Sequence, residues 1–249
     1  MEFNDLIDKI TQGDCVEGMK QIPDNSIDLV VADFPYNISN YGHSLTKVGS
    51  KVQVADFGGW DKFTDEEYTT FVLKTSKEFE RILKPQSQAY MFFDNHFAGH
   101  YTYLIEKETG LRQKCPLILY KQNPIPQIHH KNFRSAFDMC ILFTKDLDKK
   151  CKTFNFLSQQ LMKNVMEYNL EKLTDHPTEK NLNIIKRFVR ISSNKDDLIL
   201  DPFMGSGTTA IACRMLDRHF IGFEISKEYC DIANNRLKGW MSQTHLSNL

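Results

Sequence analysis

Blocks of apolar and polar positions alternate along the chain of 249 residues, and they predict strands and helices in turn. Short apolar runs bounded by turn residues are typical of buried strands. The predicted strands are Ile27–Ala32, Ala89–Phe93, Leu117–Tyr120, Met139–Phe143, Leu198–Asp201 and Phe220–Glu224. Apolar faces at helical spacing predict helices over Thr64–Lys84, His96–Thr109, Glu179–Ser192, Ser206–Leu216 and Lys227–Lys238. This order indicates an α/β fold with a doubly wound, mostly parallel sheet.

Capping residues define the start of some predicted helices, whereas other segments carry no clear signal of a helix or strand. Thr64 and Glu67 have the spacing of a capping box, so we expect a helix to begin there. Residues 146–175 are polar and mixed, and they predict no more than a helix over Ser158–Leu173. Because no repeat or low-complexity linker is visible, we expect a single domain over residues 1–249, with a variable insert at about 120–175.

Charge is unevenly distributed along the chain. The net charge is −1, which excludes binding of nucleic acid by bulk charge alone. Residues 1–111 nevertheless hold 10 basic and 18 acidic side chains, whereas residues 112–152 hold 9 and 3. The basic stretch Thr109–Phe137 contains no acid, so it favours contact with an anionic partner over an ordinary solvated face.

Cysteine spacing and apolar run length exclude several protein classes. The six cysteines show no zinc spacing, and nothing near His129 and His130 completes a metal site. The longest apolar runs, such as Met139–Phe143, are far below the roughly 18 residues of a membrane span. The acidic N-terminus is unlike a signal peptide. We therefore expect a cytoplasmic protein with reduced thiols, no bound metal and no membrane segment.

The segment Asp201–Thr209 is a candidate cofactor loop between a strand and a helix. Gly205 and Gly207 allow a tight turn and a close approach to a ligand, although a tight turn alone would also explain them. Glu224 ends the next predicted strand, where a carboxylate suits two ribose hydroxyls. No Gly-Lys-Ser/Thr follows the glycines, so an adenosine without phosphates fits better than a pyrophosphate. S-adenosylmethionine is the common ligand of that kind.

The string Asp33-Phe34-Pro35-Tyr36 closes the first predicted strand and is the candidate catalytic motif. An exocyclic amine on a nucleobase is a poor nucleophile because its lone pair is delocalised into the ring. The Asp33 carboxylate and a backbone carbonyl at position 34 would accept its N–H groups, and Tyr36 would stack on a base flipped out of a duplex. The alternative is a turn-capping acid beside a core tyrosine.

Taken together, the two motifs resemble a known enzyme family. Asp33–Tyr36 resembles the [D/N/S]PP[Y/F] signature of amino-methyltransferases, and Asp201–Gly207 is similar to their FxGxG cofactor motif. The catalytic motif comes first, as in the beta group of adenine-N6 and cytosine-N4 DNA methyltransferases. Three further segments also resemble motifs of this group and occur in the order that the group has. They are Gly13–Cys15 with Pro23–Asp28, Asn123–Pro126 and His176–Lys180. The resemblance covers about residues 12–238, apart from 146–175, and implies a Rossmann-like methyltransferase sheet with circularly permuted motif order.

The resemblance also implies a role for individual residues. The implied catalytic residues are Asp33, Phe34, Pro35 and Tyr36. The implied contacts to S-adenosylmethionine come from Asp14, Cys15, Asp33, His176, Thr178, Lys180, Asp201, Phe203, Gly205, Ser206, Gly207, Thr208 and Glu224. The implied contacts to DNA come from Lys121, Asn123, Lys131 and Arg134. The insert near 120–175 would read the DNA sequence.

Two departures from the family pattern carry expectations of their own. Phe34 stands where the first proline of the catalytic signature is usual, so we expect a looser turn that still offers its backbone oxygen. Asn181 stands where the HPTxKP string ends in proline, which puts the path into the following helix in doubt.

The resemblance implies a site-specific enzyme of the restriction–modification type that methylates the N6 amino group of adenine in duplex or single-stranded DNA. The acid at position 33 favours adenine because cytosine-N4 enzymes of this group usually carry Ser there. Cytosine-N4 methylation and a nucleic-acid binder with a decayed site remain alternatives. Methylation of RNA or of a protein amide, and a nicotinamide-dependent oxidoreductase, fit the residues less well. A homodimer is compatible with the resemblance.

Overall fold

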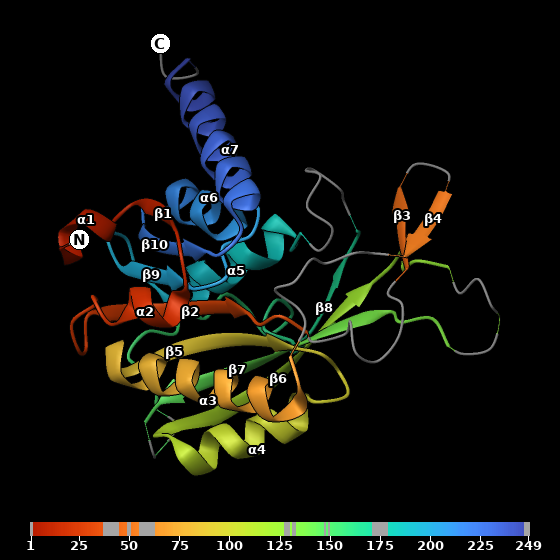
Figure 1. Ribbon diagram of the computed structural model, residues 1–249, viewed down its shortest axis with the longest axis horizontal. Coiled ribbons are helices and arrows are strands. Elements are labelled where there is room, and N and C mark those ends of the chain that lie inside the picture. The colour runs from red at the N-terminus through yellow and green to blue at the C-terminus, as the bar shows by residue number, and fades with distance from the viewer. Residues whose placement is uncertain are drawn as a thin grey trace.

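The computed structural model describes residues 2–36, 45–48, 51–54, 63–126, 130, 133–146, 148, 150–170 and 179–246. Figure 1 shows a central twisted sheet with helices on both of its faces. The helices are α1 (Phe3–Leu6), α2 (Cys15–Met19), α3 (Asp65–Ile82), α4 (Ala98–Glu108), α5 (Leu182–Ser192), α6 (Thr208–Met215) and α7 (Lys227–Leu246).

Eight strands of the described residues form the central sheet, in the order β1-β10-β9-β2-β5-β7-β6-β8. Their bounds are β1 (Lys9–Gln12), β2 (Ile27–Asp33), β5 (Leu83–Phe93), β6 (Leu111–Lys121), β7 (Phe137–Lys145), β8 (Val165–Tyr168), β9 (Leu198–Asp201) and β10 (His219–Glu224). Every neighbouring pair is parallel except the two pairs that contain β7. The predicted α/β fold with a mostly parallel, doubly wound sheet is therefore confirmed. A separate antiparallel hairpin joins β3 (Leu45–Val48) and β4 (Lys51–Val54).

Alternate residues of the central strands face two hydrophobic clusters. On β2, Val30 and Ala32 belong to the cluster under α1 to α4, whereas Leu29 and Val31 belong to the cluster under α5, α6 and α7. Both faces of the strand are covered, which explains why its sequence is a continuous apolar run. The same alternation puts Asp33, two residues after Val31, on the α5–α7 face at the carboxyl end of β2.

The chain direction across the sheet reverses between β2 and β9. From β2 the chain continues through β5 on one side, whereas β9 continues to β10, which pairs with β1 on the other side. Leu29 pairs with Ile199 and Val30 pairs with Leu200, so the two strands end side by side. Ligands bind doubly wound sheets at such a switch point, outside the carboxyl ends of the strands. The fold therefore brings the Asp33 motif and the Asp201 motif together.

One predicted element is wrong, and several boundaries differ. The helix expected over Ser158–Leu173 is absent from the described part of that segment, where a turn at 159–162 is followed by β8. β8 pairs with β6, almost 50 residues earlier, and local periodicity carries no sign of that pairing. β5 and β6 begin before the predicted Ala89 and Leu117, and α7 continues beyond Lys238.

The N-terminal caps of α3 and α5 can be compared directly with what the sequence predicts. The capping box at α3 is confirmed, because the Glu67 backbone N–H donates to the Thr64 hydroxyl and the Thr64 N–H donates to the Glu67 carboxylate. Asn181 caps α5 by accepting from the N–H groups of Asn183 and Ile184, so the helix begins cleanly without the family's proline. None of the described helices is long and apolar enough to span a lipid bilayer.

The Thr64 cap gives a testable value for the stability of the fold. Replacing Thr64 with Ala leaves the Glu67 N–H without its cap, so we expect the free energy of unfolding to fall by about 1 kcal/mol. Thr70→Ala, at an exposed position inside the same helix, is the matched control and should change stability by a few tenths of a kcal/mol in the opposite direction. Urea denaturation of both variants measures the difference, and equal midpoints would contradict the capping role.

Candidate active site

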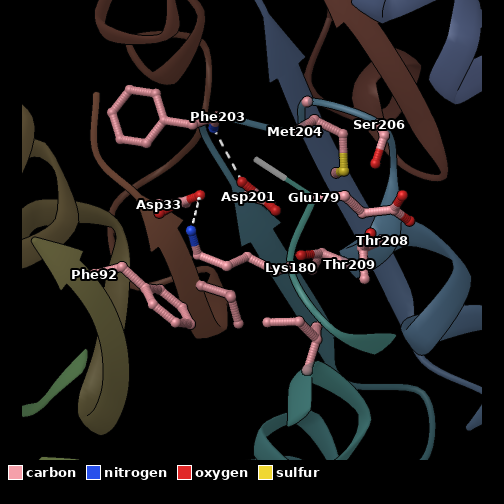
Figure 2. Close-up of a pocket in the computed structure, with 13 residues that line it drawn as sticks. Asp33, Phe92, Glu179, Lys180, Asp201, Phe203, Met204, Ser206, Thr208 and Thr209 are labelled. Atoms are coloured by element: carbon pink, nitrogen blue, oxygen red, sulfur yellow. Dashed lines mark hydrogen bonds and ion pairs between the residues drawn. The ribbon is translucent and has the colours of Figure 1, made fainter. Parts of the chain in front are cut away.

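A pocket of about 400 Å³, which includes space open to solvent, lies at the switch point. Figure 2 shows that its walls come from the ends of β2 and β9, the loop before α6, and the segment before α5. The lining residues are Val31, Asp33, Phe92, Glu179, Lys180, Ile185, Asp201, Phe203, Met204, Gly205, Ser206, Thr208 and Thr209. The catalytic and cofactor motifs, about 170 residues apart in sequence, thus share one cavity.

The Asp33 carboxylate is held on one side and has a free acceptor on the other. Its Oδ2 forms an ion pair of 2.7 Å with Lys180 Nζ, which Figure 2 draws as a dashed line. Its Oδ1 is buried and receives no hydrogen bond from the residues that the structure describes. A buried carboxylate oxygen without a donor is energetically costly, because its desolvation is not compensated. Oδ1 therefore has unused acceptor capacity in a residue that lines the pocket.

The charge state of Asp33 results from two opposing effects. Burial raises the pKa of the carboxyl above its ordinary value, because it disfavours the charged form. The neighbouring Lys180 ammonium lowers the pKa and offsets part of that rise, and a side-chain hydrogen bond with Tyr36 lowers it further. The ion pair therefore favours the carboxylate in a place where burial alone would favour the neutral acid.

Tyr36 and Phe92 lie beside Lys180, and Phe92 lines the pocket. The Lys180 ammonium donates to the Tyr36 hydroxyl at 3.0 Å and lies 5.1 Å from the ring centroids of both Tyr36 and Phe92. Cations are attracted to aromatic faces at such distances. Phe92 pairs with Asp33 in register on the adjacent strand, so the sheet itself brings the two side chains together.

Phe34 and Pro35 anchor the catalytic turn in the core. The Phe34 ring is 1% exposed, stacks on Phe93 at 4.9 Å and contacts Phe203 of the cofactor loop at 5.0 Å. The Pro35 carbonyl accepts a hydrogen bond from the Tyr68 hydroxyl. Phe34 therefore provides an aromatic link between the two motifs, where the sequence led us to expect a looser turn.

Backbone hydrogen bonds shape the cofactor loop around two acids. Asp201 Oδ1 accepts from the Phe203 N–H at 3.0 Å. The two oxygens of Glu224 accept from the N–H groups of Gly205 and Ser226, each at 2.8 Å. Burial raises the pKa of Asp201 to about 7 and also raises that of Glu224. The two carboxyl groups thus fix the loop from both of its ends.

The two glycines of the loop serve its conformation. Gly205 and Gly207 have φ of 52° and 86°, which is the left-handed region that favours glycine. A Cβ on Gly207 would lie 3.1 Å from the Cβ of Ala233 in α7. Gly207 is therefore required by the turn and by close packing of α7 behind it.

Arg236 of α7 ties the loop to the segment that carries Lys180. Its Nη1 lies 2.6 Å from Glu179 Oε1 and donates to the hydroxyls of Ser206 and Thr208 at 3.1 and 3.2 Å. The Glu179 side chain is 4% exposed and that of Arg236 is 16% exposed. A buried pair with these additional hydrogen bonds fixes relative position well, although its net contribution to stability is small.

The Gly13–Cys15 string, which holds the predicted cofactor contacts Asp14 and Cys15, lies next to the strand that ends at Glu224. The Gly13 N–H donates to the Glu224 carbonyl at 2.9 Å, which brings Asp14 and Cys15 beside the end of β10. Asp14 is exposed and caps α2 by accepting from the Glu17 N–H. Cys15 is buried, and burial raises the pKa of its thiol to about 12, so the thiol stays protonated. His176 and Thr178, the other predicted cofactor contacts, lie outside the described residues.

The predicted DNA contacts have partners within the chain. Lys121 forms an ion pair of 2.5 Å with Asp138, so its charge is largely neutralised. Asn123 holds the backbone of Leu170 through its side-chain amide. Arg134 is exposed and donates to the Pro124 carbonyl. Lys131, together with His129, lies outside the described residues.

Sequence reasoning did not identify several residues of this site. Phe92 ends a predicted strand, and its position opposite Asp33 follows only from the strand pairing. Glu179 belongs to the His176–Lys180 string that resembles the family. Its ion pair with Arg236 joins residues 57 positions apart, so the local sequence gives no sign of it. Asp138 and Tyr168, hydrogen-bonded at 2.6 Å, come from β7 and β8, and β8 itself was not predicted.

Comparison with known proteins agrees with this geometry. A glycine loop and an acidic strand end at the switch point of a doubly wound sheet define an enzyme site for a nucleoside-containing cofactor. The sequence model of the DNA methylase family, N6_N4_Mtase, matches residues 27–235. The chain belongs to this DNA methylase family.

Individual relatives cover nearly the whole chain. The type II methyltransferase M.HinfI of Haemophilus influenzae is 32% identical over 95% of this chain and 70% of its own length. The type II methyltransferase M2.DpnII of Streptococcus pneumoniae is 31% identical over 92% of this chain and 89% of its own length. The crystal structure of an M1.HpyAVI–SAM complex is similar with a TM-score of 0.67 and 25% identity, covering 92% of this chain and 99% of the other.

The conformation of Gly207 leads to a prediction for the loop. Gly207→Ala introduces a side chain at positive φ and against Ala233, so we expect the free energy of unfolding to fall by about 1–3 kcal/mol. Gly239→Ala, in α7 with no atom within 4 Å of the added Cβ, is the control and should stabilise the chain by up to about 1 kcal/mol. Thermal and urea unfolding measure both values. A neutral Gly207→Ala would show that the turn does not need glycine.

Proposed function

We propose that this chain transfers the methyl group of S-adenosylmethionine to the N6 amino group of adenine in DNA. One observation carries the proposal. Asp33, whose buried Oδ1 has no donor among the described residues, lines the same pocket as the Asp201–Thr209 loop. An acceptor placed there favours an incoming amine, which brings N–H groups and no negative charge.

The residues present fit S-adenosylmethionine better than a phosphate-bearing cofactor. Two acids, Asp201 and Glu224, hold the cofactor loop, whereas the cations Lys180 and Arg236 are already paired with Asp33 and Glu179. This charge distribution suits a sulfonium and opposes a pyrophosphate. Glu224 and Asp14 would hold the nucleoside, and the backbone from Phe203 to Thr208 would hold the methionine part.

The chemistry then rests on positioning by this chain. When bound, S-adenosylmethionine supplies a methyl group whose bonding pair stays on sulfur as nitrogen attacks. Asp33 Oδ1 accepts an N–H of the amine, which favours a tetrahedral nitrogen and a localised lone pair. The same oxygen stabilises the positive charge on nitrogen as the N–C bond forms and accepts the proton that leaves. The aromatic wall excludes water and offers Tyr36 to the flipped base.

Adenine is the favoured target, and DNA is the favoured polymer. An acid at position 33 supports adenine, and the family contains enzymes of the N6 and N4 types. The basic stretch Thr109–Phe137 and the insert near 120–175 would bind the DNA around the flipped base, with Arg134 exposed for such contact. We place the enzyme in the cytoplasm of a bacterial cell, where its DNA lies.

A labelling experiment tests this function. Full-length protein incubated with methyl-tritiated S-adenosylmethionine and adenine-containing DNA should label the DNA, and Asp33→Ala should lower the rate by about 100- to 1000-fold. Cofactor affinity, measured by calorimetry, should stay within about threefold because Oδ1 faces the amine. Asp231→Asn, an exposed acid on α7, is the control and should keep the wild-type rate.

The outcomes separate the candidate functions. Digestion of the product to nucleosides distinguishes N6-methyladenine from N4-methylcytosine. Absence of label on duplex and single-stranded DNA, with DNA binding retained, would indicate a binder with a decayed site. Label that survives Asp33→Ala would remove Asp33 from the mechanism.

A further inference from the structure

Lys180, a pocket residue that the sequence resemblance assigns to the cofactor, also contacts the catalytic motif. The resemblance assigns it to the cofactor, whereas its ammonium contacts the catalytic motif, at 2.7 Å from Asp33 Oδ2 and 3.0 Å from the Tyr36 hydroxyl. The rings of Tyr36 and Phe92 flank it, and its side chain is 15% exposed. Figure 2 shows Lys180 and Asp33 pointing toward each other, with Phe92 beside them.

The backbone on both sides of Lys180 is fixed. Glu179, the preceding residue, is held by Arg236 at 2.6 Å. Asn181, the following residue, caps α5. The Lys180 ammonium therefore reaches Asp33 from an anchored backbone. Forming the ion pair then costs little conformational entropy beyond that of ordering the Lys180 side chain.

The other charges nearby do not supply a second cation to Asp33. Asp138 on β7 is held by Lys121 at 2.5 Å and by the Tyr168 hydroxyl at 2.6 Å. Burial would raise the pKa of Asp138, yet Lys180 and Lys121 outweigh it and lower the pKa below its ordinary value. The titratable groups that interact electrostatically with Asp33 are Lys180, Tyr36, Asp138, Cys140, Tyr168 and Asp201. Among these described groups Lys180 is the cation that favours the Asp33 carboxylate through charge, and Tyr36 favours it through a hydrogen bond.

We propose that Lys180 is a positioning residue of the methyl-acceptor site, the counterion that engages Asp33 Oδ2 and leaves Oδ1 to the target amine. The proposal rests on the proposed function and adds a role for Lys180 that is separate from cofactor binding. The ammonium satisfies one oxygen and leaves the other without a donor among the described residues. It also keeps that oxygen a hydrogen-bond acceptor, since a protonated Asp33 would oppose an N–H donor.

The most direct effect of removing the Lys180 ammonium should be on the pKa of the Asp33 carboxyl. In Lys180→Met, the effect of burial on Asp33 is offset only by the hydrogen bond with Tyr36, so the Asp33 carboxyl should titrate at higher pH than in the wild type. Carbon-13 NMR of the aspartate carboxyl groups in the full chain, with Asp33→Asn for assignment, measures this without any turnover. Lys227→Met, which removes an exposed ion pair with Asp231 on α7, is the matched control and should leave the signal unchanged.

Kinetics then separate a role in acceptor positioning from a role in cofactor binding. At pH 7 we expect Lys180→Met to lower kcat for DNA methylation by about 10- to 100-fold, with partial recovery as the pH rises and Asp33 ionises. The affinity for S-adenosylmethionine should stay within about twofold. Lys180→Arg, which keeps the charge, should restore most of the rate and the wild-type titration of Asp33.

Each contrary outcome has a distinct meaning. An unchanged Asp33 titration in Lys180→Met would overturn the proposal, and so would a large loss of cofactor affinity with normal Asp33 ionisation. If the wild type methylates no DNA while the Asp33 signal still shifts in Lys180→Met, the proposed function fails and the counterion role of Lys180 stands.

Discussion

The partly buried ion pair between Asp33 and Lys180 is the interaction on which the site depends. A carboxylate at the end of a covered strand is costly unless it is paired, and Lys180 provides that partner at 2.7 Å. Lys180 satisfies one oxygen of the carboxylate, whereas the other, Oδ1, has no hydrogen-bond donor within the described chain. A site of this kind favours the carboxylate through the ion pair and still offers an acceptor, which is the combination that a weakly nucleophilic amine requires.

The sheet explains how this pair meets a cofactor loop. β2 and β9 lie side by side although their sequences are about 170 residues apart, and their ends face the same pocket. Phe34 and Phe203 then pack against each other from the two motifs, and Arg236 fixes the loop from behind. The order of motifs along the chain is therefore unimportant for the chemistry, since the switch point joins them in space.

The sequence predicted those parts of the fold whose signals are local. The continuous apolar run before Asp33 and the strand–loop–helix pattern around Asp201 both depend on neighbouring residues, and both are found as strands at the predicted places. β8 was missed because a strand of four residues is stabilised by its pairing with β6. The ion pair between Lys121 and Asp138 was not predicted either, because Asp138 lies diagonally opposite Lys121 across β6 and β7. Pairings of this kind depend on strand register, which a single sequence does not reveal.

A crystal structure of the chain with target DNA and a cofactor analogue that cannot donate its methyl group tests the central claim most directly. We expect the target amine to lie within about 3.5 Å of both Asp33 Oδ1 and the position of the transferable group, with Lys180 still on Oδ2. A flipped base whose amine contacts neither atom, or an analogue bound away from the Asp201–Thr209 loop, would contradict the account.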